Sequence, residues 1–315
     1  MSDSDLQKPM SKAWHWHPKL PIPVSPVMDV PPKPLAWIKW IASYWLVISS
    51  VTMEFMLAWM MFTIFQPDVE TMKTLSLGWI SGIWARNIIL LTLVAGSLHF
   101  WFYQLKGQGK ALKFDPRDLS RDNKKFWFRD QVKDNMFWSL ASGVTCWTGF
   151  EIFYFWSAAN GYVPGLEWRQ NPVLFALLFV ALPLWSSFHF YVIHRLLHWQ
   201  PLYKLAHALH HKNINVGPWS GIAMHPIEHL LYFSSVLIHV VVPSHPTHVL
   251  FHLYMESLNP AFSHSGFDGV FVKDKKRLEA GDFFHQLHHR HITCNYGTAE
   301  MPWDRLFGSL NNGQK

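Results

Sequence analysis

Charged side chains are scarce in this sequence. Asp, Glu, Lys and Arg make up 15% of the 315 residues, whereas an average soluble domain has about 25%. Hydrophobic residues reach 50% and include 18 Trp and 24 Phe. This composition is typical of a membrane protein, in which Trp and Tyr gather at the membrane–water interfaces. The apolar runs predict one integrated membrane unit rather than two soluble domains.

Cysteine and several common catalytic motifs are nearly or wholly missing. Cys146 and Cys294 stand 148 positions apart, so no disulfide framework and no CxxC zinc motif is expected. Zinc proteases, serine hydrolases and nucleotide-binding proteins have no support, because HExxH, GxSxG and P-loop motifs are absent. No nucleic-acid-binding motif occurs, and no signal peptide is expected because the first apolar run begins late and lacks a cleavage signature.

Histidine, by contrast, occurs 20 times and in repeated spacings. An HxxxH pair precedes one HxxHH cluster, and a second HxxHH cluster follows 74 residues later. On a helix these spacings place imidazoles on one face, and imidazole is the commonest metal-ligating side chain. Eight histidines are too many for one tetrahedral zinc ion. The pattern therefore predicts two metal ions held by nitrogen, without deciding between iron, zinc, copper and nickel.

Four apolar segments are long enough to cross a hydrocarbon core of ~30 Å. They cover residues 37–65, 79–105, 135–158 and 172–188. Residues 106–134 carry nine Lys or Arg, and the N-terminal tail carries several Lys, whereas the other two connections carry few. By the positive-inside rule, both termini and everything after the fourth span are expected in the cytoplasm.

The expected fold is an all-α integral membrane protein with four transmembrane helices and a cytoplasmic, helical, histidine-rich cap that holds a dimetal site. Residues 1–34 form a cytoplasmic tail that cannot bury enough apolar surface to fold alone. Residues 35–188 form the transmembrane region, with the basic loop 106–134, and residues 189–315 form the catalytic cap. Pro201 separates the HxxxH pair from the next cluster, so these two parts are expected on two helices that face each other.

Six motifs in order carry a resemblance to a known family. They are HRLLH (194–198), HALHH (207–211), HPIEH (225–229), SHSGFDG (263–269), HQLHH (285–289) and NYGTAEMPWDRLFG (295–308). Over residues 185–310 the chain resembles the fatty acid hydroxylase/sterol desaturase superfamily, in particular its C4-methylsterol oxidase and C5-sterol desaturase types. The resemblance implies a membrane-bound di-iron enzyme.

The resemblance also implies roles for individual residues. Metal-ligating and catalytic roles fall on His194, His198, His207, His210, His211, His285, His288 and His289. His264 is implied as a ninth ligand. His225 is a further candidate, whose alternative role is a helix start with Glu228 as its capping partner. Partners that orient the ligands are sought among His189, His229, His291, Glu228, Asp268, Asp282 and Asp304.

The function implied is an O2-dependent di-iron hydroxylase that oxidises a C–H bond of a fatty acyl, sterol or related lipid drawn from the bilayer. A ferredoxin or a cytochrome b5-type protein is the expected external electron donor, because no fused HPGG-type haem-binding segment is present. The basic loop is interpreted as a topology signal rather than a docking site for that donor. A desaturase with the same site is an open alternative, and a membrane metal-binding or transport protein is an alternative of another class. A bacterial inner membrane is favoured over the endoplasmic reticulum.

Overall fold

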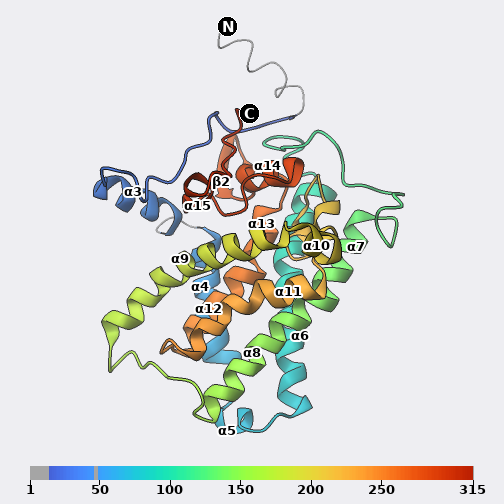
Figure 1. The fold of residues 1–315 in the computed structure, drawn as a ribbon. Coiled ribbons are helices and arrows are strands. Elements are labelled where there is room, and N and C mark those ends of the chain that lie inside the picture. Colours follow the sequence, from blue (N-terminus) through green and yellow to red (C-terminus); the bar gives the residue numbers. More distant parts are fainter. Residues whose placement is uncertain (1–13, 46–48, 315) are drawn as a thin grey trace.

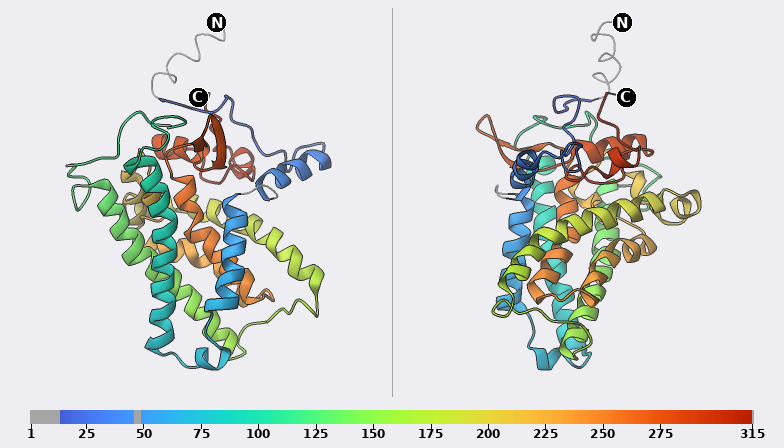
Figure 2. Two further views of the ribbon diagram at one scale, coloured as in Figure 1. Left: turned by 180° about the vertical axis from the view of Figure 1, so that it is seen from behind. Right: turned by 60° about the vertical axis from the view of Figure 1, so that its left-hand side comes forward.

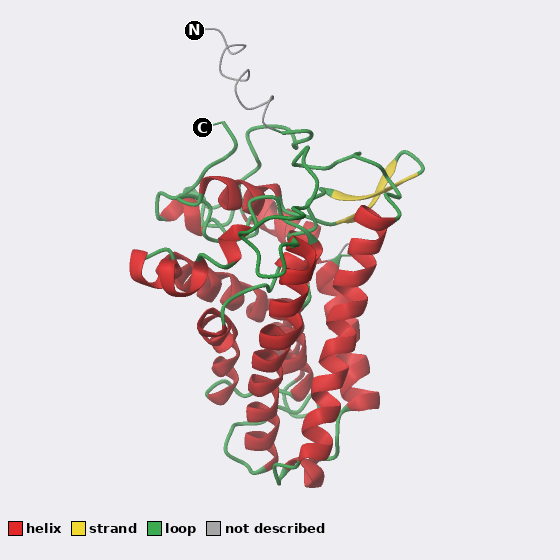
Figure 3. Cartoon of the chain, turned by 90° about the vertical axis from the view of Figure 1, so that its right-hand side faces the viewer, coloured by secondary structure: helices red, strands yellow, loops and turns green. Residues whose placement is uncertain are grey.

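A computed structural model describes residues 14–45 and 49–314 of the chain, and this part is mostly helical, with long loops and one short hairpin (Figure 3). The helices of the N-terminal half are α3 (Pro34–Trp45), α4 (Ser50–Met60), α5 (Val69–Met72), α6 (Leu77–His99), α7 (Gln131–Phe137), α8 (Val144–Ala159) and α9 (Pro172–Leu197). The helices of the C-terminal half are α10 (Gln200–Leu202), α11 (Pro226–Phe233), α12 (Pro246–Ser257), α13 (Asn259–Ser263), α14 (Phe283–His291) and α15 (Trp303–Leu306).

Shorter segments extend or join these helices. The π-helical ones are η1 (Met61–Phe65), η2 (Phe100–Gln104), η3 (Trp138–Gly143) and η4 (Tyr203–His207), and the 3₁₀ ones are η5 (His210–Lys212), η6 (Pro218–Ser220) and η7 (Ser234–Val240). One small antiparallel sheet pairs β1 (Gly269–Val272) with β2 (Lys275–Glu279). Because η1, η2 and η3 continue their neighbouring helices, the segments 50–65, 77–104 and 131–159 form three long rods (Figure 2).

Two described helices are long and apolar enough to cross a membrane, Leu77–Gln104 and Pro172–Leu197. Only 28% and 22% of the residues in their most apolar windows are buried, whereas the core helix of a soluble protein would be mostly buried. The predicted helical fold is confirmed in this part of the chain. The first predicted span is divided between α3 and the shorter apolar helix Ser50–Phe65, and residues 46–48 lie outside the described residues.

The third predicted span is helical but differs from a lipid-facing helix. Residues 135–158 lie in the rod made by α7, η3 and α8, which is not among the described helices that pass for a membrane span. Its polar residues Asn135, Thr148 and Glu151 are buried inside the protein. The rod therefore has one side in the core of the bundle, and its mean hydropathy is lowered by those residues.

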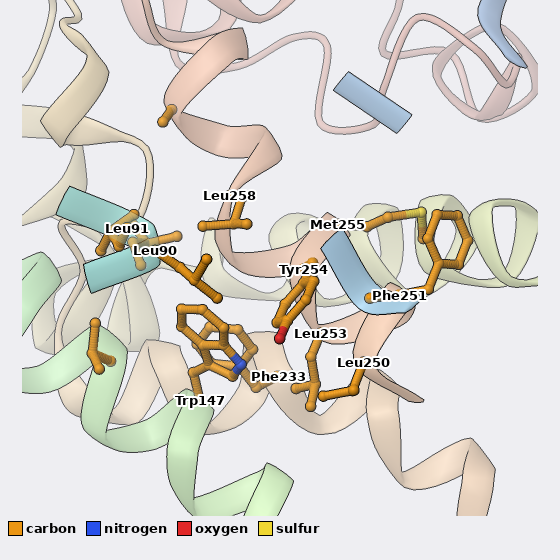
Figure 4. Packing of buried hydrophobic residues seen from close by; sticks show 14 of the residues in the cluster. Leu90, Leu91, Trp147, Phe233, Leu250, Phe251, Leu253, Tyr254, Met255 and Leu258 are labelled. Carbon is orange, nitrogen blue, oxygen red and sulfur yellow. The ribbon is translucent and has the colours of Figure 1, made fainter. Parts of the chain in front are cut away.

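Helix α12 lies at the centre of the bundle, where α4, α8 and α9 pack around it (Figure 1). Every residue from 247 to 257 is buried. Figure 4 shows its apolar side chains packed against those of α6, α8 and α11. The labelled residues are Leu90, Leu91, Trp147, Phe233, Leu250, Phe251, Leu253, Tyr254, Met255 and Leu258. This packing fixes where α12 delivers the chain that follows it.

The N-terminal segment 14–33 lies across the end of the molecule that holds α14 (Figure 1). Trp14 is buried against Phe114 and Phe283, and its ring lies under the Arg290 guanidinium at 3.5 Å. The backbone N–H of Ile22 donates to the carbonyl of Asn312 at 2.9 Å. The tail was not expected to fold on its own, and its described part is held by contacts with the cap. The sequence pattern within the tail could not reveal those contacts.

A buried ion pair joins α6 to α8. The Arg86 guanidinium donates to one carboxylate oxygen of Glu151, and the Asn87 amide donates to the other at 3.0 Å. Glu151 is fully buried and the Arg86 side chain is 10% exposed. A buried charge needs a partner, because an isolated one is strongly disfavoured in an apolar environment.

Removal of one partner should therefore destabilise the bundle. We expect Glu151→Ala to cost about 3–5 kcal/mol of stability, since it leaves Arg86 buried without its counter-charge. The double substitution Arg86→Met/Glu151→Leu should regain much of that loss, because an apolar pair leaves no buried charge. Thermal unfolding in detergent measures both, with the exposed Glu167→Ala as control. A Glu151→Ala protein that melts like the wild type would refute this role.

Candidate metal centre

Nine histidines from separate segments meet between the C-terminal end of α9, α13 and α14 (Figure 1). They form two groups, and within each group the candidate ligand atoms all lie within 4.8 Å of one another. The first group consists of His194, His198, His207, His211 and His288. The second group consists of His210, His264, His285 and His289. The structure thus brings together all eight histidines of the clusters and His264.

The two HxxHH clusters exchange members between the groups. His207 and His211, four residues apart, belong to the first group, while His210 between them belongs to the second. The other cluster does the reverse: His285 and His289 belong to the second group and His288 to the first. On an α-helix the side chains of residues i and i+4 point in similar directions. The side chain of residue i+3 points about a sixth of a turn away from that of residue i, on the other side from i+4. Each cluster therefore bridges the two groups.

Local structure fixes where these clusters begin. The Asp282 side chain caps α14 by accepting the backbone N–H of Phe284 at 2.9 Å. His198 ends α9 as its C-terminal cap, and His264 does the same for α13. These two histidines therefore lie at helix termini, where the backbone can turn, whereas His285, His288 and His289 lie within α14.

Four of the nine rings are oriented by a hydrogen bond at Nδ1. His194 donates to the carbonyl of Tyr296 at 2.7 Å, and His288 to that of Cys294 at 2.6 Å. His264 bonds the carbonyl of Pro260 at 2.9 Å, and His207 bonds a carboxylate oxygen of Glu228 at 2.7 Å. A backbone carbonyl oxygen can only accept, so the Nδ1 atoms of His194, His264 and His288 carry the proton, as does that of His207 when Glu228 is ionised. The Nε2 atoms of these rings then present lone pairs, as metal-ligating histidines do.

The facing Nε2 atoms lie too close together to be left without a proton or a cation between them. In the first group, four of them form a closed ring with neighbours 3.0–3.2 Å apart, in the order His207, His198, His288 and His211. His207 and His288 stand opposite each other in that ring and have no Nε2 proton. In the second group, three Nε2 atoms form a triangle with sides of 3.1–3.2 Å, among His264, His285 and His289. A cation between the rings satisfies every lone pair at once, so the residues fit a metal ion in each group.

The imidazoles are held in the neutral form that binds metals. Burial lowers the pKa of His198 to about 2 and that of His210 to about 4. The pKa values of six further rings are also lowered. Burial is the largest cause, and repulsion from the neighbouring imidazoles is the next. These rings are His207, His211, His264, His285, His288 and His289. No thiolate is present in either group. The donor set is therefore neutral nitrogen only.

The remaining candidates lie around the two groups. His225 is in neither group: its Nδ1 accepts the backbone N–H of Ile227 at 3.3 Å, as the N-terminal cap of α11. This is the alternative role considered for it, although Glu228 bonds His207 instead of completing the cap. His229 bonds the carbonyl of Ile222 at 2.9 Å, and His189 lies 3.0 Å from Ser234.

The acidic candidates have different tasks. Asp304 accepts the backbone N–H groups of Tyr296 and Gly297 at 2.8 and 2.7 Å, so it holds the loop whose carbonyl orients His194. Asp268 pairs with Lys276 at 2.9 Å and touches no ligand. The sequence did not reveal the carbonyls that orient the rings, because every residue has one. It also missed Tyr203 and Tyr296, whose rings lie 5.6 and 4.8 Å from that of His198.

Acid should destabilise this site. Burial lowers the pKa of His210 to about 4, whereas an unfolded histidine has a pKa of about 6.5. Between these values the unfolded chain binds a proton that the folded chain does not. Stability should therefore fall as the pH drops below about 6.5, by up to ~1.4 kcal/mol per pH unit for each such histidine.

Thermal unfolding of the purified protein tests this dependence. The melting temperature should fall from about pH 7.5 to about pH 5.5. It should change little between about pH 7.5 and about pH 8.5, because these histidines are then neutral in both states. An unchanged melting temperature on acidification would contradict the neutral, buried state of the rings.

Comparisons with known proteins agree with this geometry. The family model for fatty acid hydroxylase matches residues 179–309, which contain both histidine groups. The chain is 32% identical to a Delta(7)-sterol 5(6)-desaturase of Eremothecium gossypii, over 42% of this chain and 36% of the relative. It is 29% identical to the Delta(7)-sterol-C5(6)-desaturase of Nicotiana tabacum, over 73% of this chain and 83% of the relative. Methylsterol monooxygenase 1 of Gallus gallus is 30% identical, over 45% of this chain and 50% of the relative.

The matches to the Eremothecium and Gallus proteins thus span half of those relatives or less. No solved structure matches the chain. The matched region holds all nine converging histidines. Residues 179–309 of the chain therefore match the fatty acid hydroxylase family, and the relatives named above are sterol desaturases and a methylsterol monooxygenase.

Proposed function

We propose that this protein is a membrane-bound, O2-dependent di-iron oxidoreductase that hydroxylates a C–H bond of a lipid. The observation that carries the proposal is the pair of adjacent histidine groups, whose facing Nε2 lone pairs fit one cation each. Imidazole nitrogen suits iron among other metals. Two bound iron ions would supply the redox chemistry that activates O2 for attack on an unactivated C–H bond. An external donor, a ferredoxin or a cytochrome b5-type protein, would supply the electrons.

The chain's own residues bind and orient the centre. The five histidines of the first group would hold one ion and the four of the second group the other. Glu228 and the carbonyls of Tyr296, Cys294 and Pro260 keep four rings turned with Nε2 inward. Eight of the nine rings are buried, which limits the access of water. A dry site suits the reaction because water is a competing partner for any reactive species.

The membrane arrangement belongs to the same proposal. Four spans with both termini and the site in the cytoplasm would place the histidine groups at the membrane surface. Three features support it: the two apolar helices Leu77–Gln104 and Pro172–Leu197, the nine basic residues of the 106–134 loop, and the bond between that loop and α14. In that bond Arg290 donates to Asp115 at 2.8 Å. The named relatives come from fungi, a plant and a bird, and lend no support to a bacterial membrane.

A lipid or sterol desaturase with the same site is the second candidate. The proteins from Eremothecium and Nicotiana are named sterol desaturases, whereas the Gallus protein is named a methylsterol monooxygenase. Both reactions begin with removal of a hydrogen atom from carbon, and they differ in the fate of the resulting carbon radical. Metal transport has less support, because the two histidine groups lie together at one end of the molecule instead of along a pathway through the spans.

Lipid mass spectrometry of cells that express the protein tests the proposal. Wild type should produce a lipid heavier by one oxygen atom, and His288→Ala should abolish it because a ring of the first group is lost. His291→Ala is the matched control, since His291 lies on the same helix but is exposed and in neither group. A product lighter by two hydrogen atoms would favour the desaturase. No difference between wild type and His288→Ala, with the donor supplied, would contradict both.

A further inference from the structure

The two histidine groups differ in their contact with the surroundings. Of the nine rings, all within the described residues, His198 is the one that is partly exposed. The other four rings of the first group are buried, and so are all four rings of the second. Any molecule that approaches the centre from outside therefore meets the first group, at His198.

An apolar stripe leads to this point along the outer side of α9. Its exposed side chains recur at spacings of three, four or eight residues, so successive ones are neighbours on the helix surface and the stripe winds gradually around α9. They are Val173, Leu177, Val180, Phe188, Val192 and Leu196. Helix α9 crosses the bundle obliquely and ends beside α10 (Figure 1). Because α9 is one of the two candidate membrane helices, the stripe would face the acyl chains of the bilayer along its length.

The stripe ends in an apolar rim around His198. Trp199, which precedes the short helix α10, is 61% exposed, and Leu205, which follows it, is 56% exposed. The half-buried ring of Tyr203 lies 5.6 Å from that of His198 and 5.8 Å from that of His211. Tyr296, also half-buried, lies 4.8 Å from His198 on another segment. Two aromatic rings thus flank His198, and the exposed side chains near them in the chain are mainly apolar, with Lys204 between Tyr203 and Leu205 as an exposed cation.

We infer that the apolar chain of a lipid reaches the metal centre from the bilayer along α9 and enters at His198, between Tyr203 and Tyr296. The inference rests on the proposed function and adds a direction to it. The first histidine group faces the substrate, and the second is enclosed by protein. The exposed Leu196, Trp199 and Leu205 suit the apolar chain of a lipid. A protein donor would instead be expected to contact a surface of complementary charge, and the only charged residues among the exposed positions from 195 to 205 are Arg195 and Lys204. Arg195, the basic residue next to Leu196, is already engaged with the Phe307 carbonyl at 3.3 Å.

Photolabelling of the full-length protein in phosphatidylcholine vesicles tests the route without relying on turnover. The probes are a diazirine-bearing fatty acid and a diazirine-bearing sterol, used separately, each competed by an excess of its unlabelled parent. Probe molecules in the bulk lipid around the protein label it in a way that does not saturate and that the unlabelled parent does not reduce. Labelling from a specific site saturates and is reduced by the unlabelled parent. We expect competed labelling of residues 192–205 by at least one probe, and the probe that is competed identifies the substrate class.

Rim variants sharpen the test. Leu205→Glu should reduce the competed labelling about tenfold, since a carboxylate at the rim disfavours an apolar chain, and Trp199→Gln should act in the same direction. Leu105→Glu is the matched control: Leu105 is 57% exposed and precedes the basic loop at the same end of the bundle. Bound metal is measured in each variant and should equal that of the wild type.

The outcomes separate this route from the proposed function. Competed labelling elsewhere in the chain, or competed labelling that Leu205→Glu and Trp199→Gln leave unchanged, would overturn the route even if the enzyme oxidises lipids. Competed labelling at residues 192–205 in a protein that yields no histidine-dependent product would instead support the route and count against the reaction.

Discussion

Repulsion between converging lone pairs is the constraint on which this structure depends. Neutral imidazoles placed 3.0–3.2 Å apart at Nε2 gain nothing from each other unless a proton or a cation lies between them. Backbone carbonyls and Glu228 already take the protons of four rings. Metal binding would then supply free energy of folding as well as chemistry, because the unfolded chain has no such site. The segments that carry these histidines span residues 194–289, so metal would link more than half of the C-terminal half of the chain.

The exchange of histidines between the two HxxHH clusters couples the two groups mechanically. Each of the helical turns 207–211 and 285–289 contributes to both groups, so a shift of either turn changes both at once. The rest of the fold holds these turns in place. Asp282 caps α14, Trp14 and Arg290 clamp its outer side, and α12 leads into α13 and His264. The N-terminal segment, which has no ligand of its own, thus contributes to the site by packing on α14.

Histidine spacing and hydropathy predicted much of this arrangement. HxxxH and HxxHH indicated eight of the nine histidines that converge, and two of the four apolar runs correspond to helices that are long and apolar enough to cross a membrane. Spacing could not tell which ring joins which group, because that depends on the angle at which two distant turns approach. The capping role of His225 depends on the backbone bend before Pro226, and the packing of residues 14–33 depends on partners far along the chain. Hydropathy also does not distinguish a protein-facing side from a lipid-facing one, so it could not show that Asn135, Thr148 and Glu151 of the third apolar segment are buried in the bundle.

The number and ligation of bound metal ions test the central claim most directly. The protein, expressed with sufficient iron and purified in detergent, should contain two iron ions per chain. X-ray absorption at the iron edge should show nitrogen and oxygen neighbours without sulfur, because neither histidine group includes a thiolate. His285→Ala, which removes a ligand from the second group alone, should reduce the iron content toward one per chain. A wild-type protein that binds a single ion, or iron with sulfur neighbours, would contradict the account.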